Sequence, residues 1–311
     1  IGVVQSGPQI TADRYTYLAC LGWALLAGGG VVWVLRRREE GRVGRGVTTG
    51  VLAGVVLATL GLGYGAWEQS KIWRDSEGLW RVAIEADPGC MFCHNNLGHA
   101  LLALGRHREA EAEFRAAIAL GRDRPAAHNN LGTALASQGR YAEAELEFAD
   151  AMRLSPPLAD APANLGALYA RQGRYAEAIA LLRRALILGP DVPGARVNLA
   201  HALKNRGAER ARAGHFTEAL ADFTEAVGLS AEDADTFLNM GRALVELGRE
   251  REALAPLARA VALAPHDGSP RFWLARAHLL AGNAAEAERH TAALREIDPA
   301  LAARSSRAAV P

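Results

Sequence analysis

The sequence predicts an all-α protein in which two transmembrane helices precede an α-solenoid of about six helical repeats. Three observations support this prediction. Glycines recur at a spacing of 34 residues, at Gly98, Gly132 and Gly166. Two long apolar stretches without charged residues lie upstream of them. No segment shows the sustained alternation of apolar and polar residues that is typical of a strand.

The two apolar stretches are Tyr17–Leu35 and Val47–Trp67. Uncharged stretches of about 20 residues match the thickness of the hydrocarbon core of a bilayer. Their many glycines and alanines favour close helix packing in lipid, and aromatic residues lie near their ends, as in membrane proteins. Buried helices of a soluble protein or a signal peptide would give a similar pattern, but no basic start with a cleavage site is visible. We therefore predict two transmembrane helices within residues 15–67.

The segment 36–45 joins these stretches and contains five arginines. Short arginine-rich loops stay in the cytoplasm, so the loop 1–14 and everything after residue 67 are predicted to be extracytoplasmic. The abundance of Ala, Arg and Gly is typical of a bacterial protein. The expected location is therefore the bacterial inner membrane, as a multi-pass protein with its repeats in the periplasm. Because the chain begins inside a segment with loop character, we expect further sequence upstream of Ile1.

A repeat of 34 residues has the length of a tetratricopeptide unit, a helix–turn–helix that buries its apolar face only by stacking on its neighbours. Each repeated glycine follows a leucine and precedes an alanine by twelve residues, which fits the close packing of two helices. We predict a tetratricopeptide-repeat solenoid over residues 91–299, with a weaker sixth unit as its cap and a flexible tail at 300–311. The units are expected to begin near Met91, Pro125, Ala159, Pro193, Ala234 and Gly268.

Two segments depart from the regular spacing. Residues 68–90 carry second-helix positions only, such as Trp80 and Pro88, and are predicted to be a half-repeat that links the membrane to the solenoid. In the fourth unit Ala200 keeps the 34-residue spacing, but the second-helix signature that begins at Gly214 arrives seven residues late. Seven residues make about two helical turns. Either the first helix is lengthened with the same buried face, or it carries a protrusion that contacts a ligand.

The composition limits the classes of function. The chain carries 35 basic and 34 acidic residues, and no basic patch suggests a nucleic-acid partner. Its nine histidines are scattered singly, whereas a metal site needs about four converging ligands. No nucleophile, histidine and carboxylate occur at a suggestive spacing. We therefore predict no metal, no cofactor and no catalytic residue in these 311 residues.

Cys90 and Cys93 belong to the sequence Cys-Met-Phe-Cys-His, which fits the pattern for covalent haem attachment. The repeat also explains the histidine, because His94-Asn-Asn-Leu-Gly recurs as His128-Asn-Asn-Leu-Gly without cysteines. Three interpretations remain open: a haem site, a disulfide that ties down the first helix of the solenoid, and free or metal-bound thiols. The third cysteine, Cys20, lies in the first apolar stretch.

Asparagine recurs at one position of the units and suggests a binding surface. It precedes the packing leucine or methionine in five of the six predicted units. First helices line the concave face of such a solenoid, and amides both donate and accept hydrogen bonds. The row would bind the backbone of an extended peptide, or else these side chains bond neighbouring helices within the scaffold. Its predicted members are Asn96, Asn130, Asn164, Asn198 and Asn239.

Basic and histidine side chains fall close to this row in the predicted units. They would favour acidic or polar partners, such as proteins or extended peptides, and the alternative is that they are solvated surface residues. They are His99, Arg171, His201, Lys204, Arg242 and Arg276.

Two motifs flank the apolar stretches: Ala12–Leu18 (ADRYTYL) and Trp73–Trp80 (WRDSEGLW). With the repeats, they resemble the C-terminal portion of the transmembrane and tetratricopeptide-repeat family, whose members are similar to multi-spanning protein O-mannosyltransferases. The resemblance implies that the full-length protein is a glycosyltransferase with a lipid-linked sugar donor, and that the repeats recruit its acceptor polypeptide. The family's usual proline after Tyr-Leu is Ala19 here, and its acidic catalytic residues would precede Ile1.

The family motif implies a place at the membrane surface for Asp13, Arg14 and Tyr15. There Asp13 and Arg14 either contact the donor or form a salt bridge at the helix entry. Three functions thus remain open: the acceptor-recruiting part of a glycosyltransferase, a non-enzymatic membrane-anchored scaffold for protein–protein interaction, and a haem-bearing or other redox protein.

Overall fold

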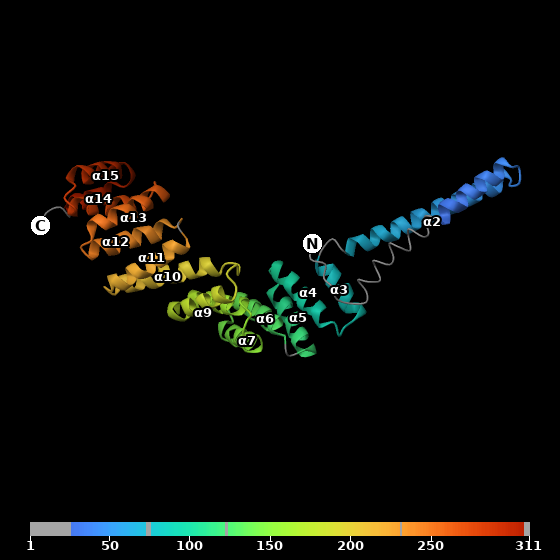
Figure 1. Ribbon diagram of the computed structural model, residues 1–311, viewed down its shortest axis with the longest axis horizontal. Coiled ribbons are helices and arrows are strands. Elements are labelled where there is room, and N and C mark those ends of the chain that lie inside the picture. Colours follow the sequence, from blue (N-terminus) through green and yellow to red (C-terminus); the bar gives the residue numbers. More distant parts are fainter. Residues whose placement is uncertain (1–25, 73–75, 122–123, 231, 308–311) are drawn as a thin grey trace. The chain divides into compact units, whose positions relative to one another are not determined.

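The computed structural model describes residues 26–72, 76–121, 124–230 and 232–307, and all regular structure in these ranges is helical (Figure 1). The predicted all-α class is confirmed for these residues. The chain forms two compact units, Ile1–Arg122 and Asp123–Pro311, which are described separately. The first unit contains the helical residues 26–39, α2 (Arg45–Ile72), α3 (Ser76–Ala86), α4 (Met91–Ala103) and α5 (His107–Leu120).

The second unit consists, over its described residues, of five helical hairpins and a final helix. The predicted starts of these hairpins agree with the observed helix starts to within two residues. The helices are α6 (Pro125–Ser137), α7 (Tyr141–Leu154), α8 (Asp160–Arg171), α9 (Tyr175–Leu188), α10 (Ala195–Arg212), α11 (Phe216–Leu229), α12 (Ala234–Glu246), α13 (Glu250–Leu263), α14 (Gly268–Leu280), α15 (Ala284–Ile297) and α16 (Pro299–Arg307).

One of the two predicted transmembrane helices has the required length and composition. Arg45–Gly65 of α2 spans 21 residues with a mean hydropathy of 1.8, and 6% of this stretch is buried. Length and composition alone are weak evidence, because a core helix or a signal sequence shares them. Much of the other predicted span, residues 17–25, lies outside the described ranges, so a pair of transmembrane helices is not shown.

Each hairpin turns at a glycine in the left-handed region. Between α4 and α5, Gly105 has a φ of 73°. Its N–H donates to the Leu102 carbonyl at 2.9 Å, and the Arg106 N–H donates to the Leu101 carbonyl at 2.9 Å. This pair of bonds is the Schellman motif, whose left-handed residue would be strained if it carried a Cβ. The equivalent glycines, with φ between 69° and 82°, are Gly139, Gly173, Gly214, Gly248 and Gly282.

A second set of glycines determines how closely the two helices of a hairpin approach. A Cβ added to Gly98 would lie 2.6 Å from the buried ring of Phe114, and one added to Gly132 would lie 2.8 Å from that of Phe148. Distances this short would force the ring away, so the closely packed arrangement requires glycine. The same relation joins Gly166 to Leu182, Gly207 to Phe223 and Gly241 to Leu257.

The register predicted for the fourth unit is wrong by seven residues. Its packing glycine is Gly207, sixteen residues before Phe223 as in the other hairpins, and not the position of Ala200. α10 has 18 residues, whereas the other first helices among the described residues have 12 or 13. Its additional N-terminal turns are packed, because Ala195 and Leu199 are buried. The first helix is therefore five or six residues longer, about one and a half turns, and keeps its buried face.

The new register places Arg206 where the neighbouring units have a packing leucine or methionine. Its guanidinium donates to both carboxylate oxygens of Asp222, at 2.6 and 3.0 Å, and Arg210 donates to the same carboxylate at 2.7 Å. The Asp222 side chain is only 4% exposed. This buried carboxylate is neutralised by two arginines, so the hairpin tolerates a charge at an apolar position.

α3 packs on α4 in the way that second helices of the second unit, such as α9 and α11, pack on the first helices that follow them. Arg106 pairs with Glu77 of α3 at 2.6 Å, which matches the pair between Arg174 and Glu145 at 3.0 Å. Hydrogen bonds from Arg81 and Arg106 lower the pKa of Glu77. α3 thus occupies the position of a second helix without a first helix of its own, and the half-repeat over 68–90 stays a prediction.

The C-terminal end differs from the predicted flexible tail at 300–311. Residues 299–307 form α16, which begins with Pro299 and is capped by Asp298, whose side chain accepts the Leu301 N–H at 2.8 Å. Ala302 is buried and packs with Phe272 and Leu294 of the last hairpin. α16 therefore covers the apolar end of the array, whereas the sequence predicts that the sixth unit is the cap. Residues 308–311 lie outside the described ranges.

The glycine contact yields a stability prediction. A Cβ at position 241 would lie 2.3 Å from Leu257 Cγ, so Gly241→Ala should lower the free energy of unfolding by about 1–3 kcal/mol. Gly228, in α11, has nothing within 4 Å of the same added atom, and Gly228→Ala should stabilise by up to about 1 kcal/mol. Urea denaturation followed by circular dichroism measures both changes. Equal midpoints for the two variants would contradict the packing argument.

Candidate peptide-binding face

The first helices of the second unit form a continuous layer. α6 packs on α8, α8 on α10, α10 on α12 and α12 on α14, whereas the second helices in the described residues show no comparable packing on each other. First helices are therefore closer together than second helices, which places them on the concave side of this unit. We define the first-helix face as the solvent-facing side chains of α6, α8, α10, α12 and α14.

Equivalent positions on this face follow from the packing glycines. The residue two places before the glycine is Asn130 in α6, Asn164 in α8, Asn205 in α10 and Asn239 in α12. In α14 Ala275 takes the place of the glycine, and the equivalent residue is Trp273; all five residues are half-buried. Asn205 takes the position that we predicted for Asn198. Asn198 lies on the same side of α10, two turns or about 10 Å nearer its N-terminus. Asn96, the remaining predicted member, is half-buried in α4 of the first unit.

One part of the asparagine row belongs to the scaffold. Asn164 Nδ2 donates to Asn129 Oδ1 at 3.0 Å, which links α8 to α6. Asn129 is itself buried and lies beside Asn130, with its Nδ2 3.5 Å from Asn130 Oδ1. The scaffold interpretation therefore holds for Asn164, because its side chain joins neighbouring first helices.

The other part of the row is open. In the described part of the chain, neither the Asn205 nor the Asn239 side chain has a hydrogen-bond partner. Each amide keeps its two N–H groups and its oxygen for a molecule on the first-helix face. These two residues therefore match what the peptide-binding interpretation requires.

The predicted cations of this region fall into two groups, and the first is already engaged. Lys204 Nζ lies 2.8 Å from Asp233 Oδ2. Burial acts to raise the pKa of Asp233, but hydrogen bonds from Lys204 and Thr236 outweigh it and lower the pKa. Arg171 donates to the Tyr141 hydroxyl at 3.2 Å and lies over its ring. His99 and His201 are exposed, His99 on α4 of the first unit.

The second group consists of Arg242 and Arg276, which flank Trp273. Their guanidinium carbons lie 4.9 and 5.1 Å from the centre of the indole ring, so both make cation–π contacts. Phe272 packs edge-on against the same ring. Within the residues that the structure covers, no carboxylate pairs with either arginine. This Arg–Trp–Arg cluster is therefore a fixed positive site on the first-helix face.

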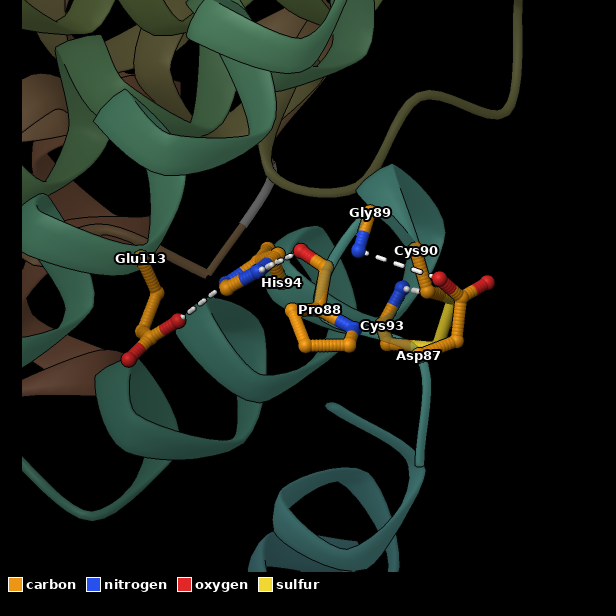
Figure 2. Close-up of a disulfide and its surroundings, with 7 residues drawn as sticks. All are labelled: Asp87, Pro88, Gly89, Cys90, Cys93, His94 and Glu113. Carbon is orange, nitrogen blue, oxygen red and sulfur yellow. Dashed lines mark hydrogen bonds and ion pairs between the residues drawn. A yellow bond between two sulfur atoms is a disulfide. The ribbon is translucent and has the colours of Figure 1, made fainter. Parts of the chain in front are cut away.

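Cys90 and Cys93 are joined by a disulfide at the N-terminus of α4 (Figure 2). His94 Nδ1 lies 2.7 Å from Glu113 Oε2, and its Nε2 lies 3.3 Å from the Pro88 carbonyl oxygen. His128 makes the same 2.7 Å contact with Glu147. The histidine of the Cys-x-x-Cys-His sequence is thus held by a contact that recurs in the next repeat, and the haem interpretation has no support.

Three of the predicted residues lie outside the described ranges, namely Asp13, Arg14 and Tyr15. Asn205 and Trp273, in contrast, were missed by the sequence analysis. The distance of sixteen residues between the packing glycine and the following aromatic residue or leucine was the signal that identifies the register of Asn205. Trp273 was missed because a search for repeated asparagines passes over a different side chain at the same position.

Stacked helical hairpins with glycine-packed cores define an α-solenoid of the repeat-protein class. Models of the tetratricopeptide repeat match residues 95–159, 204–268 and 238–302, and a second such model matches residues 158–232. The chain therefore belongs to the tetratricopeptide repeat family. Repeats of this family bind peptides or proteins, so the chain is a helical-repeat protein of the protein–protein interaction class. The matches concern the repeats and do not support the predicted O-mannosyltransferase-like family or a membrane anchor.

Solved structures of tetratricopeptide repeat proteins share the fold. The C-terminal part of a repeat protein from Cytophaga hutchinsonii is 13% identical with a TM-score of 0.56, and the match covers 74% of this chain and 92% of that one. YrrB, described as having an unusual peptide-binding site, is 20% identical with a TM-score of 0.49, and the match covers 62% of this chain and 97% of that one. Pseudomonas aeruginosa pilF is 18% identical with a TM-score of 0.47, and the match covers 70% of this chain and 96% of that one. At these identities the likeness concerns the fold alone, and no curated protein matches the sequence.

Proposed function

We propose that the chain binds extended, acidic segments of other polypeptides on its first-helix face. The observation that carries the proposal concerns adjoining first helices. Within the described residues, the amides of Asn205 and Asn239 have no hydrogen-bond partner, and Arg242 and Arg276 pair with no carboxylate. Amides at a repeated position bond peptide backbone without reading its sequence. The arginines add a preference for carboxylates, and Trp273 keeps them in place.

Charge on the rest of this face supports the same occupant. Lys204 is neutralised by Asp233, so it adds little attraction for an acidic peptide. Arg242 is exposed and Arg276 is half-buried, which leaves both guanidinium groups within reach of a bound chain. A carboxylate near them would replace water around a charge that the protein leaves uncompensated.

The amide contribution is tested by the double variant Asn205→Ala/Asn239→Ala. Two lost hydrogen bonds should weaken binding of a labelled peptide of Gly-Ser-Glu repeats roughly tenfold, since each is worth about 0.5–1.5 kcal/mol. Asn198→Ala is the matched control, because it removes the same group from the same helix two turns away. Fluorescence anisotropy measures affinity, and circular dichroism checks that helix content is kept. A larger loss in the control than in the double variant would refute the register.

The charge contribution is tested by Arg242→Gln/Arg276→Gln. This variant should lose roughly three- to tenfold affinity for the Gly-Ser-Glu peptide, while its affinity for a neutral Gly-Ser-Gln peptide stays the same. Lys204→Gln is the control and should change neither affinity much, because Asp233 already compensates that lysine. The wild-type preference should also decline with added salt. If the ratio of the two affinities is the same in the double variant as in the wild type, the proposed preference for acidic peptides is contradicted.

We also infer that α2 anchors the chain in a bacterial inner membrane, with the repeats on the periplasmic side. Its apolar side chains face outward, with Leu57 69% and Leu60 65% exposed, and Arg36, Arg37 and Arg38 precede it in the segment expected in the cytoplasm. An exposed apolar helix of this length is costly in water and fits a bilayer. The glycosyltransferase role stays an expectation of the resemblance, and no structural observation favours it.

Flotation of the full chain with phosphatidylcholine–phosphatidylglycerol vesicles tests the anchor. Wild-type protein should float, and Leu57→Arg/Leu60→Arg should stay largely in the soluble fraction, because each arginine costs about 3 kcal/mol at the centre of a span. Leu146→Arg provides the control, since Leu146 is 68% exposed on α7 of the repeats and should not affect flotation. In cells, protease added outside intact spheroplasts should digest the repeats. Repeats that survive this treatment would contradict the orientation.

A further inference from the structure

The disulfide between Cys90 and Cys93 joins two residues of one helical turn (Figure 2). Cys90 is the N-cap of α4 and Cys93 is the third residue of that helix. Their Cα atoms are 5.3 Å apart. The bond therefore ties α4 to no other element, contrary to the predicted role of fixing the first helix in place.

The next repeat shows that this turn forms without cysteines. At the start of α6, Arg124 takes the position of Cys90, and Ala127 takes that of Cys93. The Ala127 and His128 N–H groups donate to the Arg124 carbonyl at 3.0 and 3.3 Å. The Cys93 and His94 N–H groups donate to the Cys90 carbonyl at 3.0 and 3.2 Å. Since the same two backbone hydrogen bonds form in both repeats, the helix start does not require the disulfide.

The environment of the pair favours a reactive thiolate. The Cys93 N–H donates to Cys90 Sγ at 3.2 Å, so a negative charge on that sulfur would be met by a donor at the positive end of the helix. The two residues also differ in access, because Cys93 is 7% exposed and Cys90 is half-buried. An incoming thiolate would therefore attack Cys90. Stabilisation of the reduced form makes the disulfide an oxidant.

We propose that Cys90 and Cys93 form a thiol–disulfide exchange site that oxidises pairs of thiols in other polypeptides. A thiolate of the polypeptide attacks Cys90 Sγ, the bond to Cys93 breaks, and Cys93 leaves with the electron pair as a thiolate. The second thiolate of the polypeptide then attacks the sulfur that is bound to Cys90 and releases the Cys90 thiolate. The polypeptide gains a disulfide, and Cys90 and Cys93 take up its two electrons and two protons.

This site is separate from the first-helix face, because it lies in the first unit and uses none of the residues of the proposed peptide-binding face. Failure of the exchange reaction would leave the binding proposal intact, and the reverse is also true. The next repeat lacks both cysteines, so the proposed chemistry is confined to α4 among the described first helices.

Oxidation of a reduced Cys-Gly-Ser-Gly-Cys peptide by the full chain tests the proposal. Cys20, which lies outside the described residues, is replaced by Ser so that Cys90 and Cys93 are the only cysteines that can react. The oxidised protein should convert one equivalent of peptide to its disulfide, as seen by mass spectrometry after alkylation, and its helix content should not change on reduction. Cys90→Ser and Cys93→Ser should each abolish the conversion, because the exchange needs both sulfurs.

A trapping experiment distinguishes the attacked sulfur. With oxidised glutathione, the Cys93→Ser protein should form a mixed disulfide at Cys90, and the Cys90→Ser protein should react at least about tenfold more slowly at buried Cys93. Three results would overturn the proposal: equal rates in the two variants, a disulfide that the peptide reduces only in denaturant, or loss of helix content on reduction. The last two would identify a structural disulfide.

Discussion

Five hairpins of the described residues depend on one close contact, in which a buried ring or leucine of the second helix lies against a glycine of the first. The hairpin of α14 and α15 has Ala275 in place of the glycine. At Gly98 and Gly132 the partner is a phenylalanine ring, and a single methyl group in place of the glycine hydrogen would overlap it. The contact brings the two helix axes together and buries the side chain that meets the glycine. Because each hairpin has little other core of its own, stacking on the next hairpin supplies the rest of the burial.

The same contact explains how the array tolerates irregular units. The added residues extend α10 at its N-terminus and leave its buried face unchanged, because Gly207 still meets Phe223. Arg206 occupies an apolar position in that hairpin, and Asp222 compensates its charge. In this hairpin the variation is thus confined to the length of the helix and to the position next to the glycine, while the glycine contact itself is kept.

Among the described residues, arginines that pair with glutamates and arginines that pair with none have different roles. Arg106 binds Glu77 of α3, and Arg174 binds Glu145 of α7. Hydrogen bonds to Glu109 and Glu77 raise the pKa of Arg106, and hydrogen bonds to Glu177 and Glu145 raise that of Arg174, further above an already high value. Such pairs hold successive hairpins in register. Arg242 and Arg276 contact the indole of Trp273 and pair with no carboxylate of the described residues, so their charge is open to an acidic chain that reaches this face.

Local sequence determined the helices, their glycine turns and the 34-residue repeat, because these depend on backbone preferences and on spacings within one hairpin. It also pointed to asparagine as the repeated polar side chain. The sixteen-residue spacing from Gly207 to Phe223 also carried the register of the fourth unit. Tertiary structure decided the rest: that Asn164 bonds Asn129, and that Trp273 lies between two arginines. These contacts depend on distances between side chains of neighbouring helices, which spacings along the chain do not give.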